Sequence, residues 1–322
     1  MTVMGLDIGY SNVGIVSGDP GRAVGHRLPA GAGLMADMPK GLAGERSAGI
    51  PVVIDGVQWM AGVEPYRLQR GSRDLHADYC STDSYRALFH AALARAGHTH
   101  IDCLVTGLPV SHYLDEARRQ RLAAQLEGTH DIGSGLHVRV GRVSVVPQPA
   151  GGYMDWVENA TDQSIIERGR ILVVDPGYYS VDWVVIEAGE MHQHSSGSST
   201  QAMSTLIELA DQMLFDRYET RCGADRIERD IRAGRESLLV NGHSVPLFDL
   251  IQSAGDAVAP RALRELRQSL RSDLAGIDMI LLTGGGARFY RAAAETVFPD
   301  TRVTMLDDSV MGNARGYWNM GQ

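Results

Sequence analysis

One short pattern that occurs twice constrains the fold of this chain more than any other feature. Residues 7–13 and residues 175–181 both read Asp-x-Gly-Tyr-x-x-Val, without a gap. The two copies are separated by about half of the 322-residue chain. Each copy is preceded and followed by a short apolar segment of the kind that forms a strand. The sequence therefore predicts two domains built on one plan, each opening with a β-hairpin whose tip carries an aspartate.

The residue types at these tips suit a phosphate group. Gly9 and Gly177 let the backbone approach a bulky anion because no Cβ intrudes, and the N–H groups of a turn can surround phosphate oxygens. Asp7 and Asp175 would repel a phosphate directly, but they can hold Mg²⁺ through water molecules. Asp-x-Gly is also an ordinary turn signal, so the argument depends on the duplication. It predicts that two hairpins clamp a magnesium-bound polyphosphate.

Composition excludes several other classes of protein. The formal charge is −9, from 30 basic and 39 acidic residues, which argues against direct contact with a nucleic-acid backbone. The sequence shows neither the uninterrupted apolar run of a membrane span nor the features of a signal peptide. Its three cysteines form no C-x-x-C pair, which disfavours a disulfide framework or a zinc ribbon. We expect a soluble cytoplasmic protein that binds neither membranes nor DNA.

Apolar patterning predicts the secondary structure over most of the chain. Two stretches lack such a pattern. Residues 18–49 are rich in Gly, Ala, Pro and Met, and residues 195–200 are rich in Ser and Gly. The first is expected to be a loop-heavy insertion or a small flexible subdomain, and the second a loop. Residues 51–60 are expected to form a hairpin with Asp55-Gly56 at its turn. Strands are expected at 3–8, 13–17, 102–106, 136–146, 171–175, 181–187 and 278–282, and helices at 85–96 and 287–298.

Six segments, taken in order, resemble the actin-like ATPase superfamily. Within it, the chain is most similar to the plasmid-segregation ParM/StbA group of bacterial actin homologues. Pro176 and Asn12 depart from the residues usual in that family, and residues 18–49 match none of it. The segments are 7–12 (first phosphate loop), 106–111 (a Gly-Leu-Pro strand end), 146–151 (first connector), 174–183 (second phosphate loop), 282–287 (adenosine loop) and 313–317 (second connector).

The resemblance implies an α/β actin-like fold. Two similar ribonuclease H-like domains, each a mixed five-stranded sheet flanked by helices, would surround a nucleotide cleft. Domain I would comprise residues 1–160 and 316–322, with a small subdomain at about 18–80. Domain II would comprise residues 161–315, with a small helical subdomain at about 215–270. The domains would thus be discontinuous, because the last residues return to the first half.

The resemblance also implies the binding residues for ATP or GTP with Mg²⁺. Asp7 and Asp175 would hold the metal through waters, and Asp182 is either a further metal candidate or an ordinary hairpin residue. The phosphate candidates are Gly9, Tyr10, Ser11 and Asn12 in the first loop and Gly177, Tyr178 and Tyr179 in the second. The adenosine candidates are Gly284, Gly285, Gly286 and Ala287, with Arg226 and Glu228 on the charged helix 223–234.

Gln148, in the first connector, favours one reaction over another. A Gln amide does not titrate, so it cannot act as a base, but it can orient a water in line with the γ-phosphate. A sugar kinase would need a carboxylate base to deprotonate its acceptor, and residues 143–151 contain no Asp or Glu. The expected catalytic set is Gln148, Asp7 and Asp175, acting in a slow ATP hydrolysis.

Three functional hypotheses remain open at this stage. The first is a cytoskeletal ATPase that polymerises with itself into filaments and segregates plasmid DNA through a DNA-binding adaptor protein. The charge of −9 suits this hypothesis, because the adaptor and not this chain would touch DNA. The second is a non-polymerising metabolite kinase of the same superfamily. The third is a cell-shape or cell-division actin homologue, for which no amphipathic anchor is evident.

Overall fold

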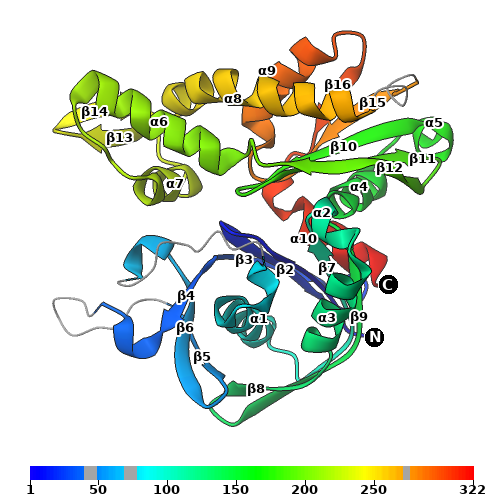
Figure 1. Ribbon diagram of the computed structural model, residues 1–322. Helices are drawn as coiled ribbons and strands as arrows, with labels where there is room; N and C mark the ends of the chain where they lie inside the picture. The colour runs from blue at the N-terminus through cyan, green and yellow to red at the C-terminus, as the bar shows by residue number, and fades with distance from the viewer. Residues whose placement is uncertain (40–48, 69–77, 271–275) are drawn as a thin grey trace. The chain divides into compact units, whose positions relative to one another are not determined.

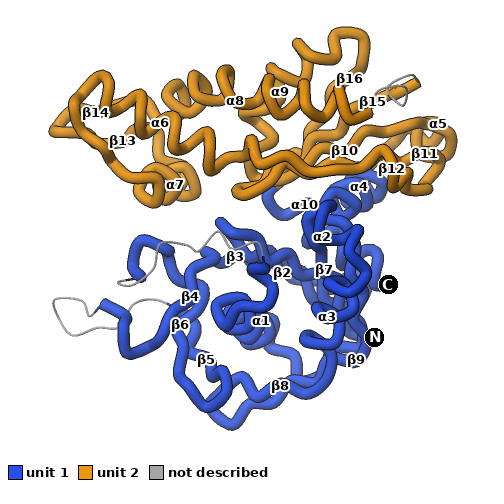
Figure 2. Tube along the Cα trace, in the orientation of Figure 1, with its two compact units in different colours: residues 1–159, 310–322 blue, residues 160–309 orange. Residues whose placement is uncertain are grey.

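The chain divides into two compact units in a computed structural model, which describes residues 1–39, 49–68, 78–270 and 276–322. Unit 1 comprises residues 1–159 and 310–322, and unit 2 comprises residues 160–309 (Figure 2). The sequence predicts that the first domain ends at residue 160 and resumes at residue 316. Each unit is described separately below.

Unit 1 is built on a mixed sheet with the strand order β3-β2-β1-β7-β9-β8 (Figure 1). β1 pairs antiparallel with β2 and parallel with β7. Its Val, Ile and Leu residues are buried, as expected for a strand in the middle of a sheet. The strands are β1 (Val3–Ile8), β2 (Asn12–Gly18), β3 (Val24–Pro29), β7 (His100–Leu108), β8 (Gly128–Gly133) and β9 (Leu136–Pro147).

Helix α1 (Asp83–Ala96) forms the centre of the unit 1 core. It lies between the main sheet and a small sheet with the order β4-β6-β5 (Figure 1). As predicted, the helix ends at Gly97, which adopts a left-handed conformation with φ of 72°. The remaining elements are β4 (Gly31–Leu34), β5 (Ile50–Ile54), β6 (Val57–Val63), η1 (Met35–Asp37), η2 (Pro65–Arg67), η3 (Tyr79–Ser81), α2 (Val110–Tyr113), α3 (Glu116–Leu126), α4 (Gln148–Asn159) and α10 (Ser309–Met320).

Unit 2 repeats the plan of unit 1. Its sheet has the order β12-β11-β10-β15-β16, in which an antiparallel three-stranded meander is followed by two parallel strands. The first five strands of the unit 1 sheet have the same order and directions. The predicted pair of mixed α/β sheets is therefore confirmed. The strands are β10 (Arg170–Pro176), β11 (Val181–Glu187), β12 (Glu190–Ser199), β15 (Met279–Leu282) and β16 (Arg302–Met305).

The helices of unit 2 bury an aliphatic core against this sheet. α8 packs against α6 and α9. Residues 215–270, expected as a helical subdomain, also contain a β-hairpin. In the described parts of the chain, no helix has the length and hydropathy that a bilayer crossing needs. The elements are α5 (Gln163–Arg168), α6 (Met203–Tyr218), α7 (Ala224–Arg232), α8 (Leu247–Leu270), α9 (Ala287–Val297), β13 (Ser237–Val240) and β14 (His243–Pro246).

One expected loop is a strand, the stretch 18–49 also contains strands, and one sheet is larger than expected. Residues 18–49 contain β3 and β4, although residues 40–48 lie outside the described chain. Residues 195–199 form part of β12, an edge strand whose Ser198 and Ser199 hydroxyls donate to Asp182 and Glu265. In both stretches strand pairing rests on backbone hydrogen bonds, so an apolar pattern is not needed. The unit 1 sheet gains a sixth strand because β8 pairs along the edge of β9.

His90 should make unit 1 sensitive to acid. Its Nδ1 donates to the carbonyl of Val53 at 2.9 Å, and burial lowers the pKa of the imidazole to about 4. An unfolded histidine binds its proton near pH 6.5, so between pH 6.5 and 4 protonation favours the unfolded chain. We expect this group to remove about 2 kcal/mol of stability across that window. His90→Gln, which keeps an N–H donor, should show a smaller fall in melting temperature from pH 7 to pH 5. Equal falls would contradict the assignment.

Candidate functional site

The two copies of the repeated pattern form the same turn. In the turn between β1 and β2, the Gly9 N–H donates to the Asn12 carbonyl at 3.0 Å. In the turn between β10 and β11, the Gly177 N–H donates to the Ser180 carbonyl at 2.8 Å. A Cβ on either glycine would lie 3.0–3.3 Å from that carbonyl oxygen, so glycine keeps both turns narrow. The repeat in the sequence is therefore also a repeat in the structure.

In unit 1, three polar side chains from distant parts of the sequence meet at the end of β1. Gln148 is the first residue of α4, and its Nε2 lies 3.5 Å from Asp7 Oδ1. Asn313, on α10, also donates a side-chain hydrogen bond to Asp7. Burial raises the pKa of the Asp7 carboxyl to about 6, although both amide hydrogen bonds act to lower it. The structure therefore brings together two predicted catalytic residues, Asp7 and Gln148, and adds a third group, Asn313.

Asp7 should make the nucleotide-free protein less stable at neutral pH. Its folded pKa of about 6 lies above the unfolded value near 3.9. The stability that protonated Asp7 contributes is therefore fully present below about pH 4, and it is lost as the pH rises through 6. We expect Asp7→Asn to raise the unfolding free energy by about 1–2 kcal/mol at pH 7.5, while nucleotide hydrolysis is lost. Thermal unfolding of the two proteins checks this, and a lower melting temperature for the variant would contradict it.

Gln148 is held in place from two further directions. The hydroxyl of Tyr317, on α10, donates to the Gln148 carbonyl at 3.3 Å. A Cβ at Gly107, near the end of β7, would overlap that hydroxyl and lie 3.0 Å from Gln148 Cγ. Gly107 therefore has to be glycine for Gln148 and Tyr317 to pack as they do. Gly107 lies in segment 106–111, which resembles the family, but the sequence alone predicts no role for it.

Helices α4 and α10 are locked to each other close to this cluster. The Arg315 guanidinium makes two hydrogen bonds to the buried Asp155 carboxylate, at 2.8 and 2.7 Å. A Cβ on Gly316 would overlap the Gly151 carbonyl oxygen, so the two helices cross at glycines. Paired, bidentate contacts of this kind fix geometry as well as adding energy. These contacts therefore fix the position of α4, which begins at Gln148, relative to α10, which carries Asn313.

In unit 2, the second hairpin lies directly against the Gly284–Gly286 turn. Asp175 is only 5% exposed, and a Cβ on Gly284 would overlap its Oδ1. The Gly286 N–H donates to the Pro176 carbonyl at 2.9 Å. Asp175 and Pro176 end strand β10, and the glycine turn follows the parallel strand β15; ligands of α/β sheets bind at such carboxyl ends. The structure therefore places Asp175 and the second hairpin turn beside two of the predicted adenosine residues, Gly284 and Gly286.

Asp182 lies opposite Asp175 in the β10–β11 register, at the place that Gly14 occupies opposite Asp7. It is almost fully buried. It accepts hydrogen bonds from the hydroxyls of Ser180, at 2.5 Å, and Ser198. These bonds satisfy a buried carboxylate, so they neither support nor exclude a part in metal binding, which stays a prediction.

Arg226 and Glu228 make contacts within the small subdomain of unit 2. The Arg226 guanidinium donates to the Leu239 carbonyl in β13 at 2.7 Å. Glu228 is buried and pairs with Arg232 at 3.2 Å. These contacts hold α7 against its neighbours, and the proposed role of both residues in purine binding stays a prediction.

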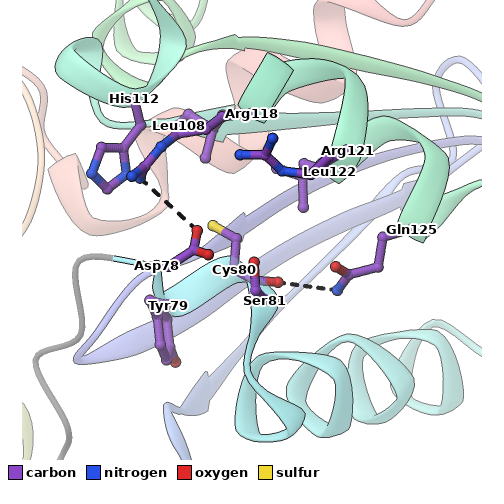
Figure 3. A pocket seen from close by; sticks show the side chains of 10 residues that line it. All are labelled: Asp78, Tyr79, Cys80, Ser81, Leu108, His112, Arg118, Arg121, Leu122 and Gln125. Atoms are coloured by element: carbon purple, nitrogen blue, oxygen red, sulfur yellow. Dashed lines mark hydrogen bonds and ion pairs between the residues drawn. The ribbon is translucent and has the colours of Figure 1, made fainter. Parts of the chain in front are cut away.

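A small pocket lies beside the first hairpin in unit 1 (Figure 3). In it Arg118 faces Asp78 at 3.9 Å, and Gln125 donates to the Cys80 carbonyl at 3.1 Å. Tyr79, which lines it, stacks on Tyr10 with ring centroids 4.3 Å apart. None of the predicted site residues lines it. The lining residues are Asp78, Tyr79, Cys80, Ser81, Leu108, His112, Arg118, Arg121, Leu122 and Gln125.

The side chains present fit a magnesium nucleotide better than a metal held by protein alone. The described residues contain no group of three or more His, Cys, Asp or Glu side chains that could hold a metal ion. Each unit instead presents an aspartate, Asp7 or Asp175, beside a turn narrowed by glycine. Mg²⁺ usually keeps several waters and is bound by one or two carboxylates together with substrate phosphates.

Comparison with known proteins agrees with this arrangement. A family model described as "Actin like proteins N terminal domain" matches residues 5–151. A second, described as "Archaeal actin homologue MreB-like, C-terminal", matches residues 173–295. A search of curated proteins found no match to the sequence.

Solved structures share the fold at low sequence identity. Ta0583, an archaeal actin homologue in complex with ADP, has a TM-score of 0.74 and 20% identity, covering 99% of both chains. A ParM in a 15-stranded filament from Clostridium botulinum has a TM-score of 0.75 and 16% identity, covering 99% of this chain and 98% of that one. Bacillus thuringiensis ParM with AMPPNP has a TM-score of 0.64 and 14% identity, covering 100% and 98%.

The two family models include both copies of the repeated hairpin, the connector at Gln148 and the Gly284–Gly286 turn. Together with the shared fold, they identify this chain as a member of the actin-like protein family.

Proposed function

We propose that this protein is an ATPase that binds MgATP and assembles into filaments. The observation that carries the proposal is the contact between the Gln148 amide and Asp7, beside the hairpin turn at Gly9. The arrangement of Asp175 against Gly284 in unit 2 supports it, because it supplies a second carboxylate beside a second glycine-narrowed turn. Each unit would present one such hairpin to a nucleotide.

The mechanism follows from which groups can move a proton and which cannot. Bound Mg²⁺ would neutralise charge on the phosphates. Asp7 and Asp175 would hold its water ligands, and the backbone at Gly9 and Gly177 would surround the phosphate oxygens. The amide of Gln148 would orient the attacking water but take no proton from it. Hydrolysis without a protein base should be slow. A slow rate suits a protein in which nucleotide hydrolysis sets how long a filament persists.

The filament part of the proposal rests on relatives. The Clostridium botulinum ParM of similar fold forms a 15-stranded filament. We propose that this chain likewise polymerises with itself, and that it segregates plasmid DNA through a DNA-binding adaptor. The net charge of −9 supports an indirect link to DNA. Filaments should therefore leave the mobility of duplex DNA unchanged at physiological salt.

Sedimentation and phosphate release test the proposal together. At micromolar concentration, the protein with Mg²⁺ and ATP, or with GTP, should pellet and release phosphate. Asp175→Ala should lose both activities, whereas Asp256→Ala, which removes an exposed carboxylate on α8, should retain them. Absence of polymer with either nucleotide would refute the filament proposal, and normal hydrolysis by Asp175→Ala would refute the site.

A further inference from the structure

We infer that Asn313 is a positioning residue, which fixes the Asp7 carboxylate for the magnesium ion of the nucleotide. This inference rests on the proposed function, because it concerns the same metal. It concerns a side chain in α10 that lies outside both hairpins and to which the sequence assigns no role of its own. Its place in the fold, rather than its sequence position, suggests the role.

Asn313 reaches Asp7 from an element that is far away in the sequence. It is 4% exposed and donates a side-chain hydrogen bond to the Asp7 carboxyl group. Gln148 approaches the same carboxyl at 3.5 Å from the start of α4. Two amides from two different helices thus converge on one carboxylate. Such a pair limits rotation of the carboxylate and determines which of its lone pairs remain for another ligand.

The backbone that carries Asn313 is rigidly placed. A Cβ on Gly5, in β1, would overlap the Ala314 carbonyl oxygen, so α10 packs directly on the strand that ends at Asp7. Two residues after Asn313, Arg315 makes its bidentate pair with Asp155. The amide of Asn313 therefore cannot drift away from Asp7 without disturbing the packing of α10 on β1.

Packing alone does not explain an asparagine at this position. The neighbouring Ala314 and Tyr317 are fully buried, so an apolar side chain would suit this surface of α10. Burying an amide costs free energy unless its hydrogen bonds are made. The Asp7 carboxyl accepts a hydrogen bond from this amide and so offsets part of the cost. Side chains that hold a metal-binding carboxylate in this way typically change metal affinity by about 10–100-fold when removed.

Calorimetric titration with ADP, in Mg²⁺ and in EDTA, tests the inference without any measurement of turnover. The wild-type protein should bind ADP more tightly in Mg²⁺ than in EDTA. Asn313→Leu keeps the side-chain volume and removes the hydrogen-bond donor. In Mg²⁺ this variant should bind ADP about tenfold more weakly than wild type, and in EDTA its affinity for ADP should equal that of wild type. Asn313→Ala provides a second variant if the leucine form does not fold. Trp318→Phe, which removes a hydrogen bond from α10 to Gly18, is the structural control and should retain the full magnesium effect.

A double-mutant cycle shows whether Asn313 acts through Asp7. In an Asp7→Asn background, Asn313→Leu should cause no further loss of ADP affinity in Mg²⁺. Additive losses, or an unchanged magnesium effect in both Asn313 variants, would overturn the inference and leave the proposed function standing. If wild-type protein bound ADP equally in Mg²⁺ and EDTA, the proposed metal site itself would be wrong.

Discussion

Replacing Gln148 with alanine should slow ATP hydrolysis by about 100-fold while the protein still binds MgADP within about threefold of the wild-type affinity. A group that orients the attacking water contributes to the transition state and little to ground-state binding. The Gln148 amide lies at the start of α4, 3.5 Å from Asp7, where it can do this without contributing a charge. Phosphate release under saturating ATP and calorimetric titration with MgADP provide the two measurements.

Two further variants separate this role from general damage to the protein. Gln148→Glu keeps a hydrogen-bonding group of the same length, so it should recover a measurable part of the rate. Gln120→Ala removes an exposed glutamine on α3 that bonds only within its helix, and it should hydrolyse ATP normally. A Gln148→Ala protein with wild-type turnover would exclude water positioning by this side chain.

The same variant should also affect the polymer. If hydrolysis weakens the contacts between subunits, filaments of Gln148→Ala should assemble with ATP and then persist. Light scattering after assembly should decay more slowly than for wild type as ATP is consumed. Equal decay would mean that hydrolysis at this site does not control disassembly.

The fold and both hairpin tips could be predicted from the sequence because their signals are local. The pattern shared by residues 7–13 and 175–181 fixes one turn, whose backbone hydrogen bond is the same in both copies. Apolar runs on either side predict the paired strands. Gln148 was assigned from its place in a connector, and the structure adds the direct contact with Asp7.

The remaining contacts have no local signal. Asn313, Tyr317 and Gly107 fall in segments that resemble the family, but they meet around Asp7 and Gln148 only because α10, α4 and β7 pack together, and no spacing in the sequence encodes those contacts. Residues 195–199 of β12 have the Ser- and Gly-rich composition that predicts a loop, whereas the hydroxyls of Ser198 and Ser199 satisfy carboxylates at a sheet edge. In each case the role of the residue depends on a partner from another part of the chain.

Replacing Gly284 with alanine should both destabilise unit 2 and abolish magnesium-dependent nucleotide binding. Gly284 has a φ of +76°, and a Cβ there would overlap Asp175 Oδ1. The backbone conformation alone costs alanine about 1 kcal/mol. Collision with a buried carboxylate adds about 1–3 kcal/mol of the kind seen when a packed site is overfilled. The expected loss is therefore about 2–4 kcal/mol, measured as a fall in melting temperature, with no detectable MgADP binding.

Gly189→Ala provides the matched control for this prediction. Gly189, in the turn between β11 and β12, has a φ of +82°, but nothing lies within 4 Å of the place where its Cβ would be. It should therefore show the backbone cost alone, a fall of a few degrees, and bind MgADP normally. The difference between the two variants isolates the contact with Asp175. If both lost equal stability and both bound MgADP, Gly284 would be a turn residue only, and its place beside Asp175 would have no bearing on the nucleotide.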